Sequence, residues 1–313
     1  MFTGFQNIPK IPELKRRILI TLFLLTIYRI GVHVPTPGID GQALSAFFKA
    51  QAKGTLFSLF DMFTGGALEN FSVFALGIMP YISASIILQL LTVVIPQLER
   101  LSKEGEEGRK KIVQLTRYGT VLISIIQGFM ISVGLEKMTP AGEPVVLNPG
   151  WNFRLMTIIT LTAGTAFIMW LGEEITERGI GNGISLIIFT GIVARIPMAI
   201  INTFTYLKTG EIRIFFLLII LVCMIVVVGI IIFVERGQRR IPVQYAKRIV
   251  GRKIYGGQTT HLPLKINTAG VIPPIFASSI MMFPATVVNF VEIPWMKIVS
   301  NNLMPGKILY ELL

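Results

Sequence analysis

The chain has 313 residues, of which 52% are hydrophobic and only 15% are charged, and its mean hydropathy is +0.68. This composition excludes an ordinary soluble globular domain and indicates a membrane protein. The formal net charge of +12 is compatible with nucleic-acid binding, so the placement of the basic residues has to decide between the two.

Apolar runs of spanning length predict seven transmembrane helices, because a helix needs roughly 20 apolar residues to cross a bilayer. Two of the runs are interrupted, one by Arg29 and His33 and the other by Arg195. These residues lie toward one end of their spans, where long side chains can reach the interface. In chain order, the predicted spans are residues 18–39, 71–95, 118–135, 155–172, 183–202, 214–234 and 266–291.

The basic residues alternate between the segments that connect these spans. With the N-terminus in the cytoplasm, the cytoplasmic segments carry about twice as many Lys and Arg residues as the outer ones, as the positive-inside rule requires. Because the charge follows membrane topology, it favours a multi-pass membrane protein over a nucleic-acid-binding protein. The predicted orientation is N-terminus inside, with the C-terminus of this seven-span chain outside.

The sequence offers no catalytic or metal-binding constellation. Its two histidines, His33 and His261, lie at a helix end and in a loop, and no HExxH, GxSxG or P-loop motif is present. The acidic residues lie in loops or at helix ends, whereas an ion-coupled transporter usually places one near the bilayer midplane. We therefore expect no enzyme, no cofactor and no metal. A secondary transporter of a small solute remains the alternative to a passive channel.

The stretch GIMPYISASIILQLL, residues 77–91, has a proline inside an uncharged, apolar, helix-like run. Ile78, Ile82 and Ile86 are spaced at i, i+4 and i+8 and so form one stripe. β-Branched side chains are stiff, and small neighbours allow another helix to approach. The stripe therefore fits a rigid lining of a narrow gap, although lipid-facing or core packing is the commoner origin of such a pattern, and the pattern alone does not decide between them.

The stretch WLGEEITERGIGNGISLIIFTGI, residues 170–192, predicts a span that ends at Leu171, a charged turn, and a glycine-rich entry into the next span. Glycines permit unusual backbone conformations at this entry. Ile184 and Ile188 are again spaced at i, i+4 on the helix that follows.

Both stretches resemble the signature segments of the SecY family of protein-conducting channels, almost residue for residue. The likeness extends to MFTGGALENFSVFALGIMP (62–80), ERGQRRIPVQYAKR (235–248) and HLPLKINTAGVIPPIFASSI (261–280), and so covers nearly the whole chain. It implies an all-α membrane protein, a multi-span helical bundle built as an inverted repeat with a re-entrant plug helix. The resemblance also implies that residues 1–205 form the first half, with five spans. Residues 206–313 would then form an incomplete second half, and we interpret the chain as truncated before the last three of ten spans.

The resemblance further implies a pore that carries unfolded polypeptide and is closed by a ring of apolar side chains. A plug of about residues 55–70 would block the resting pore, and a lateral gate would release apolar segments into lipid. The implied positions are Ile78, Ile82, Ile184, Ile188 and Ile275 in the pore ring; Leu59, Phe60, Met62, Phe63, Gly65 and Gly66 in the plug; and Gln89, Gln127 and Asn267 as polar contacts of the gate.

The basic loop of residues 235–265 is implied to dock the ribosome or the motor ATPase SecA, through Arg240, Arg252 and Lys253. Attraction of this loop to anionic lipid headgroups is the alternative from the charges alone. The resemblance also implies the small membrane subunits SecE and SecG as partners, secretory and membrane-protein nascent chains as substrates, and the bacterial plasma membrane as the location.

Overall fold

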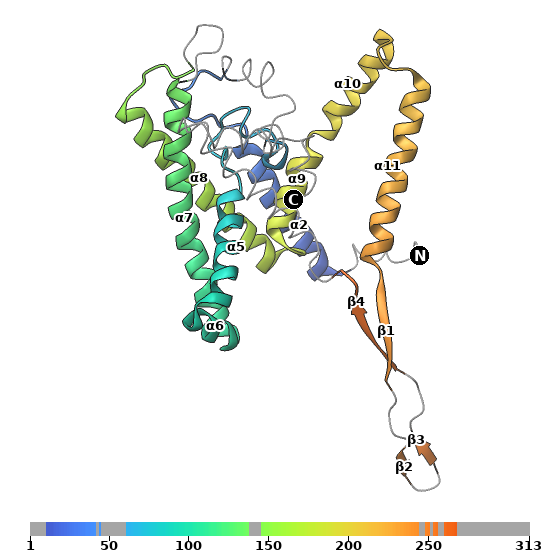
Figure 1. Ribbon diagram of the computed structural model, residues 1–313. Helices are drawn as coiled ribbons and strands as arrows, with labels where there is room; N and C mark the ends of the chain where they lie inside the picture. The colour runs from blue at the N-terminus through green and yellow to red at the C-terminus, as the bar shows by residue number, and fades with distance from the viewer. Residues whose placement is uncertain are drawn as a thin grey trace. The chain divides into compact units, whose positions relative to one another are not determined.

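The computed structural model describes residues 11–41, 44, 61–137, 145–243, 248–250, 253–255 and 260–267 (Figure 1). The chain divides into two compact units, Met1–Pro197 with Phe276–Leu313, and Met198–Ile275. Most described residues are helical, as the sequence predicts for a membrane bundle. The boundary between two repeat halves near residue 205 stays a prediction.

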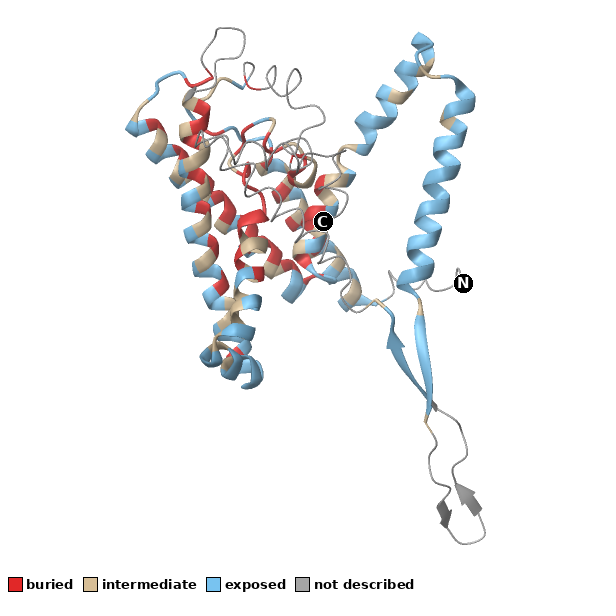
Figure 2. Ribbon diagram, viewed as in Figure 1, coloured by how far each residue is buried: buried red, intermediate tan, exposed pale blue. Residues whose placement is uncertain are grey.

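The first unit is a helical bundle arranged around one central helix, α8, which packs against α2, α5, α7 and α9. Its buried side chains include Leu161, Ile168, Leu171 and Ile175. Figure 2 colours the ribbon by burial, and the buried residues lie in this unit. The helices of this unit are α2 (Pro12–Gly31), α5 (Met79–Val94), α6 (Pro96–Lys103), α7 (Glu106–Lys137), α8 (Trp151–Arg178) and α9 (Gly183–Val193).

Close helix packing in this unit depends on glycines of α8 and α9. A Cβ atom at Gly164 would lie 2.0 Å from the carbonyl oxygen of Val73, and one at Gly183 would lie 2.0 Å from the carbonyl oxygen of Gly172. Backbones can approach this closely only where no side chain stands between them. The glycine-rich entry therefore serves close packing at Gly183, while Gly181 provides a positive φ of 71° for the turn before α9.

Among the described residues, four helical segments are long and apolar enough to cross a membrane: Glu106–Glu136, Trp151–Arg178, Gly183–Thr209 and Ile214–Glu235. A fifth results if α5 and α6, which are bent by 102° at their junction, count as one broken span. Helix α2 has the length for a span but carries charged residues, four of them in its first half. The predicted span over 266–291 lies outside the described residues, except for its first two.

Two predicted helix boundaries were wrong. Residues 71–78 are not helical, and α5 begins at Met79 with Pro80 in its first turn, where the missing N–H of proline costs nothing. The positive φ values of Phe71 (41°) and Gly77 (56°) are incompatible with a helix before that point. Likewise, α8 does not end at Leu171 but continues to Arg178.

The charged end of α8 is helical because its side chains find partners there. Arg117 of α7 forms an ion pair with Glu173, with Nη2 2.8 Å from Oε2, and Arg178 pairs with Glu174 one turn away. The hydroxyl of Thr176 donates to the carbonyl of Gly172. Charged residues after an apolar run therefore mark the polar end of a long helix here, rather than a turn.

The second unit contains all but the first two residues of α10 (Ile196–Thr209), together with α11 (Ile214–Glu235) and a β ribbon. The predicted span over 183–202 lies within the apolar helical segment Gly183–Thr209, in which a two-residue turn separates α9, ending at Val193, from α10, beginning at Ile196. A turn at Gly210, with φ 79°, connects the two helices of this unit. Every residue of α11 except the half-buried Leu217 is exposed, as the pale blue ribbon of this helix in Figure 2 shows for nearly its whole length, and this suits a helix surrounded by lipid.

The basic loop after α11 is a two-stranded ribbon, which the sequence did not reveal. Strand β1 (Gln238–Val243) pairs antiparallel with β4 (Thr260–Lys265), and β2 (Arg248–Val250) pairs antiparallel with β3 (Lys253–Tyr255). No residue of β1 is buried, so its sequence lacks the apolar alternation by which a half-buried strand is predicted.

Replacing Gly164 with Val should destabilise the bundle, because the new side chain would overlap the Val73 backbone. Overpacking of this kind costs about 1–3 kcal/mol or more, so thermal unfolding in detergent should begin at a lower temperature. The matched control is Gly229→Val in α11, where nothing lies within 4 Å of the added Cβ. Equal unfolding temperatures for the two variants would contradict the packing described for α8.

Candidate functional site

The described part of the predicted plug, residues 61–70, forms a compact turn within the first unit, the plug turn. Residues 61–64 are helical, and the chain then reverses through Gly65 and Gly66, whose φ values are 70° and 91°. Such values favour glycine at both positions. Met62 and Phe63 are half-buried, and Leu59 and Phe60 lie outside the described residues.

Two helices hold the backbone of this turn. From α2, the hydroxyl of Tyr28 donates to the carbonyl of Thr64 at 3.0 Å, and Nη1 of Arg29 donates to the carbonyl of Gly65 at 3.0 Å. From α9, Gly191 approaches so closely that a Cβ at Gly65 would lie 2.8 Å from its Cα atom. The turn is thus seated between α2 and the end of α9.

A buried carboxylate closes the turn from within. The side chain of Asp61 is only 4% exposed, and its Oδ1 accepts from the backbone N–H groups of Leu68 (3.1 Å) and Glu69 (2.8 Å). Its Oδ2 forms an ion pair with Nη2 of Arg195, which follows α9. The same Nη2 lies 3.8 Å from Oε2 of Glu69, so one arginine contacts both acidic residues of the turn.

The non-helical segment after the turn satisfies its backbone groups by pairing with the chain after α2. The N–H of Thr36 donates to the carbonyl of Phe71, and the N–H of Val73 donates to the carbonyl of Val34, each at 2.9 Å. The segment packs into a buried apolar cluster. Members of that cluster are Leu44, Leu68, Phe71, Ala75, Leu76, Leu135, Val145, Val146, Phe153 and Leu161.

A row of aromatic rings connects this segment to α2 and α8. Phe74 stacks on Tyr28 with ring centroids 5.9 Å apart and on Phe167 of α8 at 6.0 Å. Trp170 extends the row beyond Phe167 at 5.6 Å. Such aromatic pairs stabilise beyond their buried area by about 0.5–1.5 kcal/mol each, so Phe74 fixes the chain between two helices just before α5 begins.

Four of the predicted pore-ring isoleucines lie on or next to the first two turns of α5 and α9. Ile78 caps α5 and is buried, whereas Ile82 is half-buried one turn later. On α9, Ile188 is buried and Ile184 is half-buried beside Gly172 of α8. Ile275 lies outside the described residues, and the ring as a whole stays a prediction.

The predicted gate residues are distributed over both units. Gln89 is exposed on α5 and Gln127 is half-buried on α7, and these two helices pack against each other. Asn267 follows the ribbon, where its amide donates to Oε1 of Glu235 at 2.8 Å. Their role in a gate stays a prediction.

The predicted docking residues belong to the ribbon. Arg240 is exposed on β1 opposite Pro263, Lys253 begins β3, and Arg252 lies outside the described residues. Neighbouring side chains of a strand point to opposite faces, so Arg239 and Arg240 present their charges on different sides of the ribbon.

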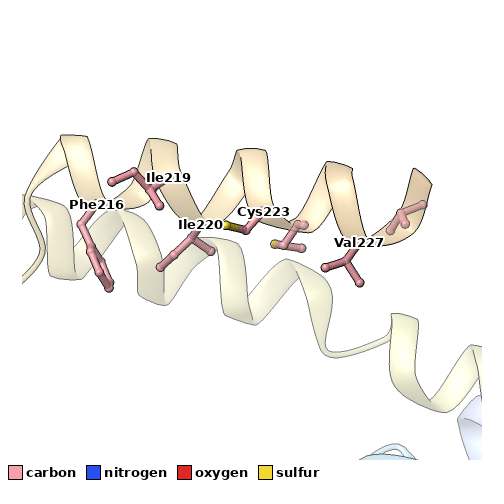
Figure 3. A pocket seen from close by; sticks show the side chains of 7 residues that line it. Phe216, Ile219, Ile220, Cys223 and Val227 are labelled. Carbon is pink, nitrogen blue, oxygen red and sulfur yellow. The ribbon is translucent and has the colours of Figure 1, made fainter. Parts of the chain in front are cut away.

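Helix α11 also carries a shallow apolar pocket, seen in Figure 3. All seven lining residues come from this one helix, among them Phe216, Ile220 and Cys223. No polar group contributes to it, so it lacks the convergent polar groups by which a specific ligand site is recognised.

Sequence reasoning missed the residues that hold the plug turn. It placed Arg29 and Arg195 at span ends facing the interface, whereas both contact the turn. A signal for this arrangement exists in the sequence, because charged residues within spans mark functional sites by default and need partners. Asp61 and Glu69, in a short segment between two spans, were the available acidic partners.

Comparison with known proteins identifies the family. The family model for SecY matches residues 72–313. The chain belongs to the SecY family. The protein translocase subunit SecY of Escherichia coli strain K12 is 52% identical over 305 residues, which cover 96% of this chain and 68% of that protein.

Solved SecY-family structures share the fold. One, whose description states that the plug domain of SecY stabilises the closed state of the translocation channel and maintains a membrane seal, matches with a TM-score of 0.63 and 21% identity. The match covers 91% of this chain and 62% of that one. Sec61 in the canine ribosome–channel complex matches with a TM-score of 0.62 and 19% identity, over 90% of this chain and 63% of that one.

These relatives are a translocase subunit and protein-conducting channels, so the expectation of a SecY-family channel subunit, rather than an enzyme, is confirmed. Nothing in the comparisons supports the transporter alternative. With the apolar helices described above, membership of the SecY family also confirms a multi-pass membrane protein. The chain spans less than two thirds of the length of the solved channel chains that it matches.

Replacing Tyr28 with Phe should loosen the plug turn while leaving the aromatic row intact, because only the hydrogen bond to Thr64 is lost. A net loss of about 0.5–1.5 kcal/mol should speed amide hydrogen exchange in peptides covering residues 61–70 by about two- to tenfold. Tyr118→Phe, at an exposed position of α7, is the control. Unchanged hydrogen exchange in the Tyr28→Phe protein would contradict a stabilising role for the Tyr28–Thr64 hydrogen bond.

Proposed function

We propose that this chain forms the larger part of a channel that lets unfolded secretory polypeptides cross a membrane and releases apolar segments sideways into the bilayer. The observation that carries the proposal is the seated turn of residues 61–70 inside a SecY-family bundle. Non-helical backbone is tolerated at membrane depth only where it is buried in protein or lines a water-filled cavity, and a displaceable plug meets this condition.

The isoleucines at the starts of α5 and α9 are proposed to line the constriction. Stiff, uncharged side chains can exclude ions by dewetting and can yield around a polypeptide without binding a particular sequence. Ile78, Ile82, Ile184 and Ile188 are suited to this role by their chemistry and by the helix starts from which they project. Ile275 is proposed as a further member on the seventh span.

Lateral release is proposed to need no catalyst. A translocating helix rich in Leu and Ile gains several tenths of a kcal/mol per residue in the bilayer, whereas a central Arg or Asp costs about 3 kcal/mol. Uncharged polar contacts between membrane helices contribute only about 0.6–2 kcal/mol each. Gln89, Gln127 and Asn267 are therefore proposed as parts of a seam that can reopen.

The ribbon after α11 is proposed to dock a cytosolic partner, either the ribosome or SecA. The solved ribosome complex of the related canine Sec61 channel supports a ribosome as one such partner. SecE and SecG are proposed as membrane subunits, and anionic lipids as a second binding surface for the basic residues. The bacterial inner membrane is the proposed location, with the N-terminus in the cytoplasm, the orientation predicted by the positive-inside rule.

Photocrosslinking tests the pore. In membranes that contain the complete channel complex, a photoreactive residue at Ile82 or Ile188 should form adducts with a stalled secretory polypeptide. The same group at Ile219, exposed on α11, should form few adducts with the polypeptide and should crosslink to lipid instead. If the stalled intermediate forms and neither isoleucine position reacts with it, these side chains are ordinary packing residues and the proposed ring is wrong.

Charge reversal tests the ribbon. Arg240→Glu should weaken binding of the complex to ribosomes at least about tenfold and reduce the salt dependence of binding, because a contact with a polyanion is replaced by repulsion. Arg239→Glu makes the same change on the opposite face of β1 and is the matched control. Equal losses for the two variants would indicate non-specific attraction, and would contradict docking through Arg240.

A further inference from the structure

Among the described residues, Arg195 is the cation that meets the acidic side chains of the plug turn: it pairs with Asp61 and lies 3.8 Å from Oε2 of Glu69. The other contacts from α2 and α9 reach the backbone of the turn, at Thr64 and Gly65. Asp61 is buried, and its two carboxylate oxygens have different partners. Its Oδ1 accepts from two backbone N–H groups within the turn, and its Oδ2 faces Arg195.

The contacts of the two Asp61 oxygens would respond differently if the plug turn moved. The two N–H donors belong to Leu68 and Glu69, so they would move with Asp61 if the turn left its seat as a unit. Arg195 belongs to the chain that follows α9 and would stay behind. Charge-assisted hydrogen bonds from backbone N–H groups stabilise a carboxylate strongly, and the departing Asp61 would keep them.

Arg195 is suited to hold such a contact and to release it. It lies just beyond the C-terminal residue of α9 and before α10 begins, a place where a helix dipole favours a cation and disfavours an unpaired carboxylate. Its side chain is 40% exposed, so the guanidinium would be partly hydrated after the pair breaks. A fully buried partner could not be separated at so small a cost.

From this geometry we propose that Arg195 is a latch residue, which holds the plug turn closed through Asp61 and releases it when the channel opens. The inference rests on the proposed channel function and adds the residue pair that sets how often the resting channel opens. Glu69, 3.8 Å from the same guanidinium nitrogen, is a weaker second partner. Tyr28 and Arg29 position the turn by donating to its backbone carbonyls, so their contacts do not depend on the charged side chains of the turn.

The test measures ion leakage by the complete channel complex in planar bilayers in potassium chloride, without a translocating polypeptide. Arg195→Gln and Asp61→Asn should each raise the frequency of spontaneous opening by about 10- to 100-fold, the range expected from loss of a charged hydrogen bond. The double variant should leak no more than the leakier single variant, because both changes remove the same contact. Arg195→Lys should restore most of the closed state.

The matched control is Arg178→Gln, which removes an exposed arginine from an ion pair with the half-buried Glu174 at the end of α8 and should leave the resting conductance unchanged. Thermal unfolding of each complex and translocation of a secretory precursor are measured in parallel. A merely structural role for the pair would lower the unfolding temperature and the translocation rate, whereas a latch raises resting conductance in complexes that still translocate.

The outcomes separate the latch from the channel function. If the unaltered complex translocates and Asp61→Asn assembles with an unaltered resting conductance, the latch is wrong and the channel function stands. If Arg195→Gln fails to assemble, the leakage of Asp61→Asn is measured alone and in combination with Arg195→Lys. These two measurements then decide the question in the same way. If the unaltered complex neither translocates a precursor nor conducts ions under any condition, the proposed function itself is wrong.

Discussion

The structure depends on one constraint: an irregular backbone inside a membrane bundle must have every polar group satisfied by protein or water. Residues 61–77 meet it through contacts with elements far away in the sequence. Tyr28 and Arg29 donate to the turn, and the chain after α2 pairs with the segment after it. The helices α2, α8 and α9 have to lie where they do for this segment to be accommodated.

Small residues make that accommodation possible. Gly164 admits the backbone of Val73, and Gly191 admits the turn at Gly65, at distances that any side chain would prevent. Membrane helices gain little from hydrophobic burial against one another, so close backbone packing supplies much of their attraction. Of these two glycines, Gly191 is the one that lets α9 approach the plug turn, at Gly65.

Much of the candidate site could be read from the sequence, although its polar part could not. Ile78 and Ile82, like Ile184 and Ile188, follow helical spacing, and all four are buried or half-buried, which accords with that pattern. Arg29, Asp61 and Arg195 gave no local pattern, because their partners are 36 residues away for the Arg29 bond to Gly65 and 134 for the Arg195 bond to Asp61. Residue type predicted that these charges needed partners, but not which ones.

By itself, the sequence determined the class of the protein, because hydropathy and the alternation of basic residues depend only on composition along the chain. It also determined the family, through segments matched almost residue for residue. Only the tertiary structure decided where α5 begins, how far α8 continues, that β1 pairs with β4, and that Arg195 meets Asp61. The physical reason is that each of these depends on contacts between distant segments, which local propensity and periodicity cannot encode.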